Sequence, residues 1–270
     1  VGTVVAIAAP WPSYTAEPVR IDAVPAASDT VLACDGPLLA LGRTIESAGA
    51  LSVAAPAELV SGPAASDAEQ SALGGDAGAD TAALRAAPQN EAPTPLAAAG
   101  SAASTADDLA GFSASGCRPP LAESWLVAGA TTLGANDLVV LGNPGAVPAT
   151  VQLSVYGAQG VSTPPGGANI VVPAGGQRVV PLAGLLLGEE SPVVRVTASG
   201  APVRASLQAS LTRLLLPGGV DQAVGDGKGP DRRGQVAAVA APVHEGLVDG
   251  DLAEEVIHVV PRAGAARQDH

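Results

Sequence analysis

Apolar and polar residues alternate along the stretch from Val203 to Leu211, which reads Val-Arg-Ala-Ser-Leu-Gln-Ala-Ser-Leu. In an extended chain successive side chains point to opposite faces, so this run predicts a strand with one dry face and one solvated face. The same period of two recurs from Thr150 to Tyr156 and from Pro192 to Ala198. A helix would need apolar residues three and four apart, so the pattern favours an antiparallel sheet.

Seven short apolar runs separated by Gly- and Pro-rich turns lie between Leu121 and Arg213. They are Trp125–Val127, Leu138–Leu141, Val151–Tyr156, Ile170–Val172, Val179–Leu182, Val193–Val196 and Val203–Leu211. No segment with a helical period interrupts them, which argues against a parallel sheet. The spacing predicts an all-β fold, an immunoglobulin- or fibronectin-like antiparallel β-sandwich, over residues 121–217.

The rest of the chain is less regular. Residues 1–20 begin with a run of small and apolar side chains, too short to cross a membrane, which we interpret as the remnant of an export or anchor segment. A short edge strand or an unstructured apolar start is the alternative. We interpret residues 21–120 as a small β or irregular region, with one or two strands between Pro18 and Leu41 that include Thr30–Cys34. The stretch from Pro56 to Ser115 has low complexity, and we expect part of it to be a disordered, flexible loop or a poorly packed subdomain. Residues 218–270 predict an irregular, flexible tail.

Composition narrows the class of protein. Apolar residues make up 47% of the 270 residues but aromatic residues only 2%, so Ala, Val and Leu must form the core. The formal net charge is −13, and the few Arg residues are scattered. Because no basic surface is available to neutralise phosphates, we expect no nucleic-acid partner, and contact with a membrane only through the N-terminal segment.

The two cysteines, Cys34 and Cys117, lie far apart in the chain, with no second cysteine or histidine near either. A structural zinc site needs four ligands, so this spacing argues against a metal. We expect a disulfide that brackets the low-complexity stretch, which requires an oxidising compartment. Two buried free thiols in an intracellular protein are the alternative.

The sequence contains only incomplete matches to three well-known catalytic or phosphate-binding motifs. The run from Gly111 to Gly116 approaches the nucleophile elbow G-x-S-x-G but does not match it. His244-Glu245 begins a string like HExxH, but position 248 is Val248. Gly225 to Gly229 lacks the strand, helix and Gly-Lys-Ser/Thr of a phosphate-binding loop.

Adjacent carboxylates occur at Asp107-Asp108, Glu189-Glu190 and Glu254-Glu255. A glycosidase needs two carboxylates that face each other across a sugar, one of them desolvated, whereas neighbours in a turn are usually solvated. We therefore expect no catalytic residues, no metal ligands and no cofactor.

Trp125 and Tyr156 are the best candidates for ligand binding, because aromatic rings stack on sugars. Trp125 stands beside Leu126 and Val127, however, which favours a role in the sandwich core over a stacking role.

Several segments carry a family resemblance. The stretch from Cys117 to Gly134, with Leu141–Gly145 and Thr150–Gly157, resembles an actinobacterial family of envelope proteins known only as a domain of unknown function. The further matching segments are Ile170–Pro173, Val180–Gly184, Glu190–Val196 and Pro217–Asp221. The resemblance covers about Cys34 to Asp221. It implies an N-terminal export or anchor segment, a paired cysteine and extracytoplasmic sandwich domains, and no established activity.

These observations together predict a secreted or membrane-anchored, non-catalytic cell-envelope module. Such a module would present a β-sandwich surface to another envelope protein or to a wall polymer. The alternative is a carbohydrate-binding or hydrolytic cell-wall domain, and exposed rings at Trp125 or Tyr156 beside convergent carboxylates would favour it.

Overall fold

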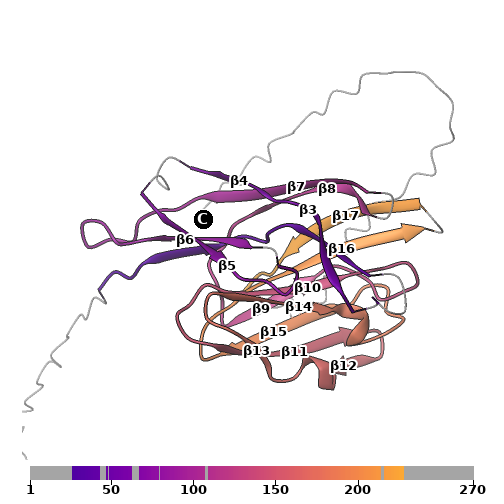
Figure 1. The fold of residues 1–270 in the computed structure, drawn as a ribbon. Coiled ribbons are helices and arrows are strands. Elements are labelled where there is room, and N and C mark those ends of the chain that lie inside the picture. Colours follow the sequence, from indigo (N-terminus) through magenta and orange to yellow (C-terminus); the bar gives the residue numbers. More distant parts are fainter. Residues whose placement is uncertain are drawn as a thin grey trace, which may run out of the picture.

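The computed structural model describes residues 26–42, 47, 49–62, 67–78, 80–106, 109–213 and 216–227. These residues form antiparallel sheets stacked in three layers (Figure 1). The helical elements in these ranges are the short 3-10 turns η2 (Pro165–Gly167) and η3 (Leu182–Gly184). Within the same ranges, no helix has the length and apolar character needed to span a membrane.

The lower and middle layers form a β-sandwich. The lower sheet has the strand order β12-β11-β15-β9, with β13 also paired to β11, and the middle sheet has the order β14-β10-β16-β17. The strands are β9 (Glu123–Val127), β10 (Leu138–Asn143), β11 (Ala149–Gly157), β12 (Gly160–Ser162), β13 (Ile170–Val172), β14 (Gly176–Pro181), β15 (Val193–Ser199), β16 (Arg204–Arg213) and β17 (Leu216–Val224). A strand is present at each of the seven predicted runs, which confirms the all-β sandwich; its immunoglobulin-like detail stays a prediction.

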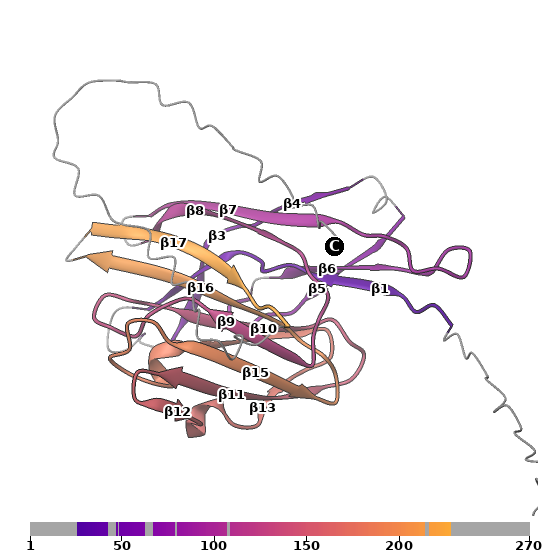
Figure 2. The ribbon, with the colours of Figure 1, turned by 180° about the vertical axis from the view of Figure 1, so that it is seen from behind.

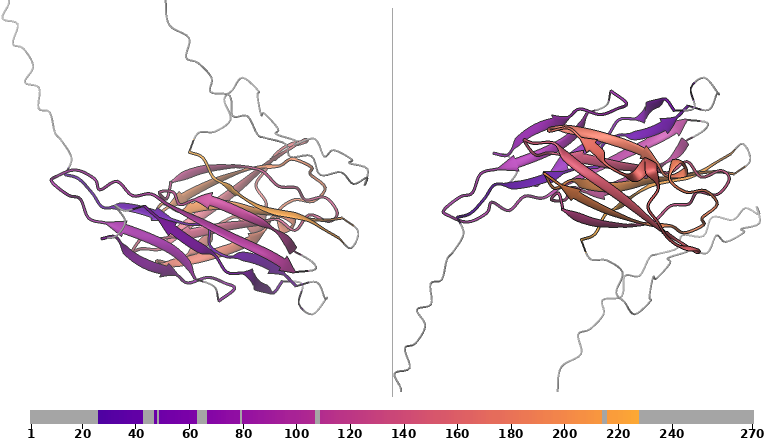
Figure 3. Two further views of the ribbon diagram at one scale, coloured as in Figure 1. Left: turned by 90° about the horizontal axis from the view of Figure 1, so that it is seen from above. Right: turned by 90° about the horizontal axis from the view of Figure 1, so that it is seen from below.

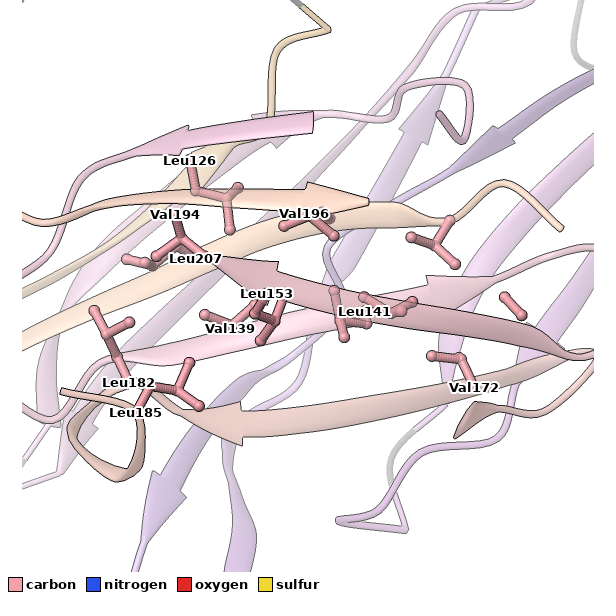
Figure 4. Packing of buried hydrophobic residues seen from close by; sticks show 14 of the residues in the cluster. Leu126, Val139, Leu141, Leu153, Val172, Leu182, Leu185, Val194, Val196 and Leu207 are labelled. Atoms are coloured by element: carbon pink, nitrogen blue, oxygen red, sulfur yellow. The ribbon is translucent and has the colours of Figure 1, made fainter. Parts of the chain in front are cut away.

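The sandwich core lies between these two sheets and consists of aliphatic side chains (Figure 4). The alternation of side chains along each strand places apolar residues in this core. Val151, Leu153 and Val155 of β11 point inward and are fully buried, while the residues between them point outward. Leu126 of β9 and Leu207 of β16 are also fully buried in this core. Small branched side chains therefore fill the space that larger rings occupy in many sandwiches.

The two central strands of the middle sheet, β10 and β16, are buried on both faces. Every residue of β10 is buried, and the polar positions of β16, which the sequence predicts to be solvated, are buried as well. Arg204, Ser206 and Gln208 are each less than 5% exposed. The prediction of a solvated face was wrong because a third layer covers it. Seen from behind, β16 and β17 lie between that layer and the lower sheet (Figure 2).

The N-terminal part of the chain covers the middle sheet with three small sheets, together called the third layer, with orders β1-β6-β5, β2-β3 and β4-β7-β8. Within it, Leu32 of β1 and Leu84 of β6 pack against Leu59 of β4. The strands are β1 (Thr30–Ala33), β2 (Leu38–Leu41), β3 (Leu51–Ala55), β4 (Glu58–Ser61), β5 (Glu69–Leu73), β6 (Thr81–Ala86), β7 (Ala98–Ala106) and β8 (Leu109–Gly116). The described residues between Pro56 and Ser115 thus include strands β4 to β8, in the stretch where the sequence predicts a flexible loop or a poorly packed subdomain.

Small side chains make this third layer possible. A Cβ at Gly111 of β8 would lie 3.0 Å from both the backbone nitrogen and a side-chain carbon of Val220 on β17. Ala55, Ala102 and Val220 belong to the same small apolar cluster between the layers. The Ala, Gly and Ser residues of this stretch therefore allow the strands of two sheets to approach closely.

Polar side chains of β16 join the third layer to the sandwich. Arg204 Nη2 donates a hydrogen bond to Asp35 Oδ1 at 2.7 Å, and both side chains are almost fully buried. Gln208 pairs with the backbone of Leu39: the Leu39 N–H donates to Oε1 at 2.9 Å, and Nε2 donates to the Leu39 carbonyl at 2.7 Å. The Gln208 amide thus satisfies both backbone groups of a residue on another sheet.

A disulfide between Cys34 and Cys117 ties the third layer together, as the sequence predicts. Cys34 follows β1 and Cys117 follows β8, and their neighbours Ala33 and Arg118 exchange two backbone hydrogen bonds. The bond therefore joins the start of the N-terminal layer to its end, beside the point where the chain enters the sandwich.

The sandwich extends past its expected end at residue 217. Strand β17 runs to Val224, so the first part of the predicted tail belongs to the middle sheet. Asp226 then exchanges two backbone hydrogen bonds with Trp125 on the free edge of β9. Residues 228–270 and the proposed export remnant at residues 1–20 lie outside the described residues.

Candidate functional site

The outward surface of the lower sheet, here called the outer face, is the strongest candidate for a binding site. The view from below in Figure 3 looks onto this sheet, with the N-terminal layer behind it. Residues that pair directly across antiparallel strands share a face, so the strand register orders the outer face into four rows. The rows are Val171–Thr150–Ser199, Gln152–Thr197–Glu123, Ser154–Arg195–Trp125 and Val161–Tyr156–Val193–Val127.

The two aromatic side chains of the sheet meet on this face. The ring centroids of Trp125 and Tyr156 lie 5.2 Å apart, with the planes tilted by 45°. The guanidinium carbon of Arg195 lies 5.6 Å from the centroid of the Trp125 ring, in the range of a cation–π contact. The two rings and Arg195 form a continuous cluster from three neighbouring strands, which we call the aromatic cluster.

The expected core role of Trp125 was wrong. Trp125 is only partly buried and points outward, whereas its neighbour Leu126 is fully buried in the core. Adjacent strand residues face opposite sides of a sheet, so the apolar character of Leu126 says nothing about where Trp125 points. Tyr156 is likewise partly buried on the outer face. Both rings therefore lie where a ligand can reach them.

One carboxylate of the outer face belongs to the same cluster. Arg195 Nη2 donates a hydrogen bond to Glu123 Oε2 at 2.7 Å, and the indole N–H of Trp125 donates to Oε1 at 3.0 Å. These two hydrogen bonds lower the pKa of Glu123 below its ordinary value, and the bond from Arg195 contributes more than the bond from Trp125. The hydrogen bond with Glu123 in turn raises the pKa of Arg195. Glu123 is therefore ionised, and its charge is balanced by Arg195.

A groove of about 200 Å³ lies beside the aromatic cluster, over β11 and β15, and is called the polar groove here because five of its seven lining residues have uncharged polar side chains. Its lining carries hydroxyl and carboxamide groups of five side chains: Thr150, Gln152, Asn169, Thr197 and Ser199. The hydroxyls of Thr197 and Ser199 make long hydrogen bonds of 3.4 and 3.3 Å to backbone carbonyls. No acidic or basic side chain lines the groove within the described residues. Sequence reasoning missed it because isolated Thr, Ser and Gln residues carry no motif.

The opposite end of the outer face is apolar. Tyr156 stands in a row with Val161, Val193 and Val127, one residue from each of the four strands. Val161 is 60% exposed and Val127 51% exposed. The outer face therefore changes along the strands from neutral polar groups, through a balanced ion pair, to an aromatic and aliphatic end.

A second cavity, of about 370 Å³, lies at one end of the sandwich beside Asp137. Asp137 accepts hydrogen bonds from the Ala130 N–H at 2.6 Å and the Ser210 N–H at 2.9 Å. Burial raises the pKa of Asp137, although these two backbone donors act in the opposite direction. Because both oxygens bind backbone groups, Asp137 connects the start of β10 to the loop before it and to β16.

The structure gives structural roles to two other sequence candidates. Ser113, the serine of the incomplete nucleophile elbow, is buried in β8 and donates a hydrogen bond to Gln222 at 2.9 Å. Glu189 of the adjacent acidic pair accepts a hydrogen bond from the Ala158 N–H at 3.0 Å. The histidines and the pairs at 107–108 and 254–255 lie outside the described residues. Among the described residues, no three His, Cys, Asp or Glu side chains gather to form a metal site.

Comparison with curated proteins and with solved structures finds no match. Residues 72–266 match the model of a family of unknown function, DUF5719. This range contains the whole sandwich and Cys117, begins after Cys34, and continues past Asp221, where the resemblance read from the sequence ends. Since the match covers well over half of the chain, the protein belongs to DUF5719, a family of unknown function.

Proposed function

We propose that this protein is a non-catalytic, extracytoplasmic module of the cell envelope whose outer face binds a wall glycan. The observation that carries the proposal is the aromatic cluster: the rings of Trp125 and Tyr156 lie 5.2 Å apart on an outward sheet surface. Aromatic rings with an apolar body and a polar edge suit the faces and hydroxyls of sugars.

The disulfide supports the proposed location. Disulfides persist in oxidising compartments and are rare in the cytosol, so a bond between Cys34 and Cys117 fits an exported protein. Thiol titration of native, unreduced protein after denaturation tests this part. We expect no reactive thiol, and two reactive thiols would identify an intracellular protein instead.

The ion pair on the outer face favours binding over hydrolysis. A glycosidase needs a protonated carboxyl group as its general acid, with a second carboxylate across the sugar. Glu123 is held ionised by Arg195 and Trp125, which is the opposite of what a general acid requires. A hydrolytic wall domain remains the alternative, and release of soluble sugar from purified walls would support it.

A sedimentation assay with purified, insoluble cell-wall glycan tests the binding function. We expect wild-type protein to sediment with the glycan and the double variant W125A/Y156A to remain in solution. Phe112 is a matched control, because it is a 64% exposed aromatic residue on β8, in the N-terminal layer. F112A should sediment like the wild type. Equal sedimentation of W125A/Y156A and wild type would refute the assignment of the site.

A further inference from the structure

We propose that the polar groove and the aromatic cluster are two adjoining subsites for one neutral oligosaccharide, whose chain runs along β11. This inference rests on the proposed glycan-binding function and specifies the ligand of that site. It makes the groove a hydrogen-bonding subsite and the aromatic cluster a stacking subsite.

The chemistry of the groove matches an uncharged, hydroxyl-rich ligand. Gln152 and Asn169 contribute carboxamides, each of which both donates and accepts hydrogen bonds, and the three hydroxyl side chains do the same. A sugar presents neighbouring hydroxyls with the same double character. Since Thr197 and Ser199 make only long hydrogen bonds to the backbone, their hydroxyls have further capacity for a ligand.

The order of the rows places the two subsites along the strand direction. Thr150 and Gln152 border the groove, and Tyr156 lies farther along the same strand, with Ser154 between them. The seven residues from Thr150 to Tyr156 are separated by six steps of extended chain, which span about 20 Å. A single sugar ring cannot contact both ends of such a surface, so the ligand is an oligomer.

Charge selects a neutral chain over an anionic one. Arg195, the basic residue of the aromatic cluster, is already paired with Glu123, and the groove adds no charged side chain within the described residues. The chain as a whole carries a formal charge of −13. A polyanionic polymer would meet long-range repulsion, and the described rows of the outer face contain no unpaired basic side chain to offset it.

Isothermal titration calorimetry tests the two-subsite arrangement with β-1,4-linked N-acetylglucosamine and glucose oligomers of increasing length. For at least one series we expect wild-type affinity to rise from the monosaccharide to the longer oligomers. The groove variant Q152A/T197V should reduce affinity for the longer oligomers about tenfold, since each lost neutral hydrogen bond is worth roughly a factor of a few. It should leave binding of the shortest bound oligomer unchanged.

Control variants and alternative outcomes separate this inference from the proposed function. Q70A/T105V makes the same changes at exposed positions of β5 and β7 and should bind like the wild type. If W125A/Y156A abolishes binding but Q152A/T197V does not weaken it, the glycan site stands and the second subsite is refuted. If the wild type binds none of these oligomers or the wall glycan, both proposals fail. Tighter binding of dextran sulfate than of neutral oligomers, or a dimer in solution that W125A/Y156A dissociates, would overturn the neutral ligand.

Discussion

The substitution Q208A tests whether polar contacts hold the N-terminal layer onto the sandwich. Gln208 is 1% exposed, and its side-chain amide bonds to both the N–H and the carbonyl of Leu39, at 2.9 and 2.7 Å. Alanine at this position removes both hydrogen bonds and leaves the N–H and the carbonyl of the buried Leu39 without a side-chain partner. An unsatisfied buried group costs about 1–3 kcal/mol, so we expect a loss of roughly 2–6 kcal/mol in the free energy of unfolding.

Urea unfolding followed by circular dichroism measures this loss as a lower midpoint. Q208E sharpens the test, because a carboxylate can accept from the Leu39 N–H but cannot donate to the carbonyl, and it also buries a charge. We expect Q208E to be at least as unstable as Q208A. The matched control is Q152A on the outer face, which should change stability by less than about 0.5 kcal/mol. A Q208A protein as stable as Q152A would refute the reasoning.

Three further perturbations test the same architecture. C34A/C117A removes a cross-link between residues 83 apart and should lower the free energy of unfolding by about 4–5 kcal/mol in the chain-entropy model, whereas a loss under about 1 kcal/mol in urea titrations would contradict the prediction. R204M leaves Asp35 buried without its partner and should cost about 3–5 kcal/mol, while the double variant D35L/R204M should recover most of this; a double variant less stable than R204M would refute the ion-pair interpretation. The raised pKa of Asp137 means that the folded state keeps a proton which the unfolded state has lost, so its contribution to stability falls as pH rises from the ordinary value of 3.8 through the folded pKa. Urea midpoints should therefore show wild type losing stability relative to D137N across this window, and a difference that does not change with pH would contradict the assignment.

Local alternation was enough to predict the sandwich strands. The inward residues of β11 and β15 are apolar or small, and the outward ones are polar or aromatic apart from Val193, so each strand carries its own two faces in its sequence. The run Leu138–Leu141 is apolar throughout, which is the pattern of a strand buried on both sides, and β10 is such a strand. The position of the disulfide followed from there being only two cysteines in the chain.

The candidate site was predicted only in part. Both aromatic residues were identified from their type, but the groove residues Gln152 and Thr197 were not, because they become neighbours only when β11 pairs with β15. The contact of Trp125 with Arg195 depends in the same way on the pairing of β9 with β15. A strand register brings together residues that no spacing along the chain connects.

What the sequence by itself determined is which side chains share a face of a strand, because that depends only on the period of two in an extended backbone. What only the tertiary structure decided is what covers each face. Arg204 and Gln208 look like solvated residues, yet they are buried because Asp35 and Leu39, about 170 positions earlier in the chain, supply their hydrogen-bond partners. The same polar pattern on β11 stays open to solvent, since no other layer of the described structure packs on it, and that difference makes one face an internal interface and the other a candidate binding site.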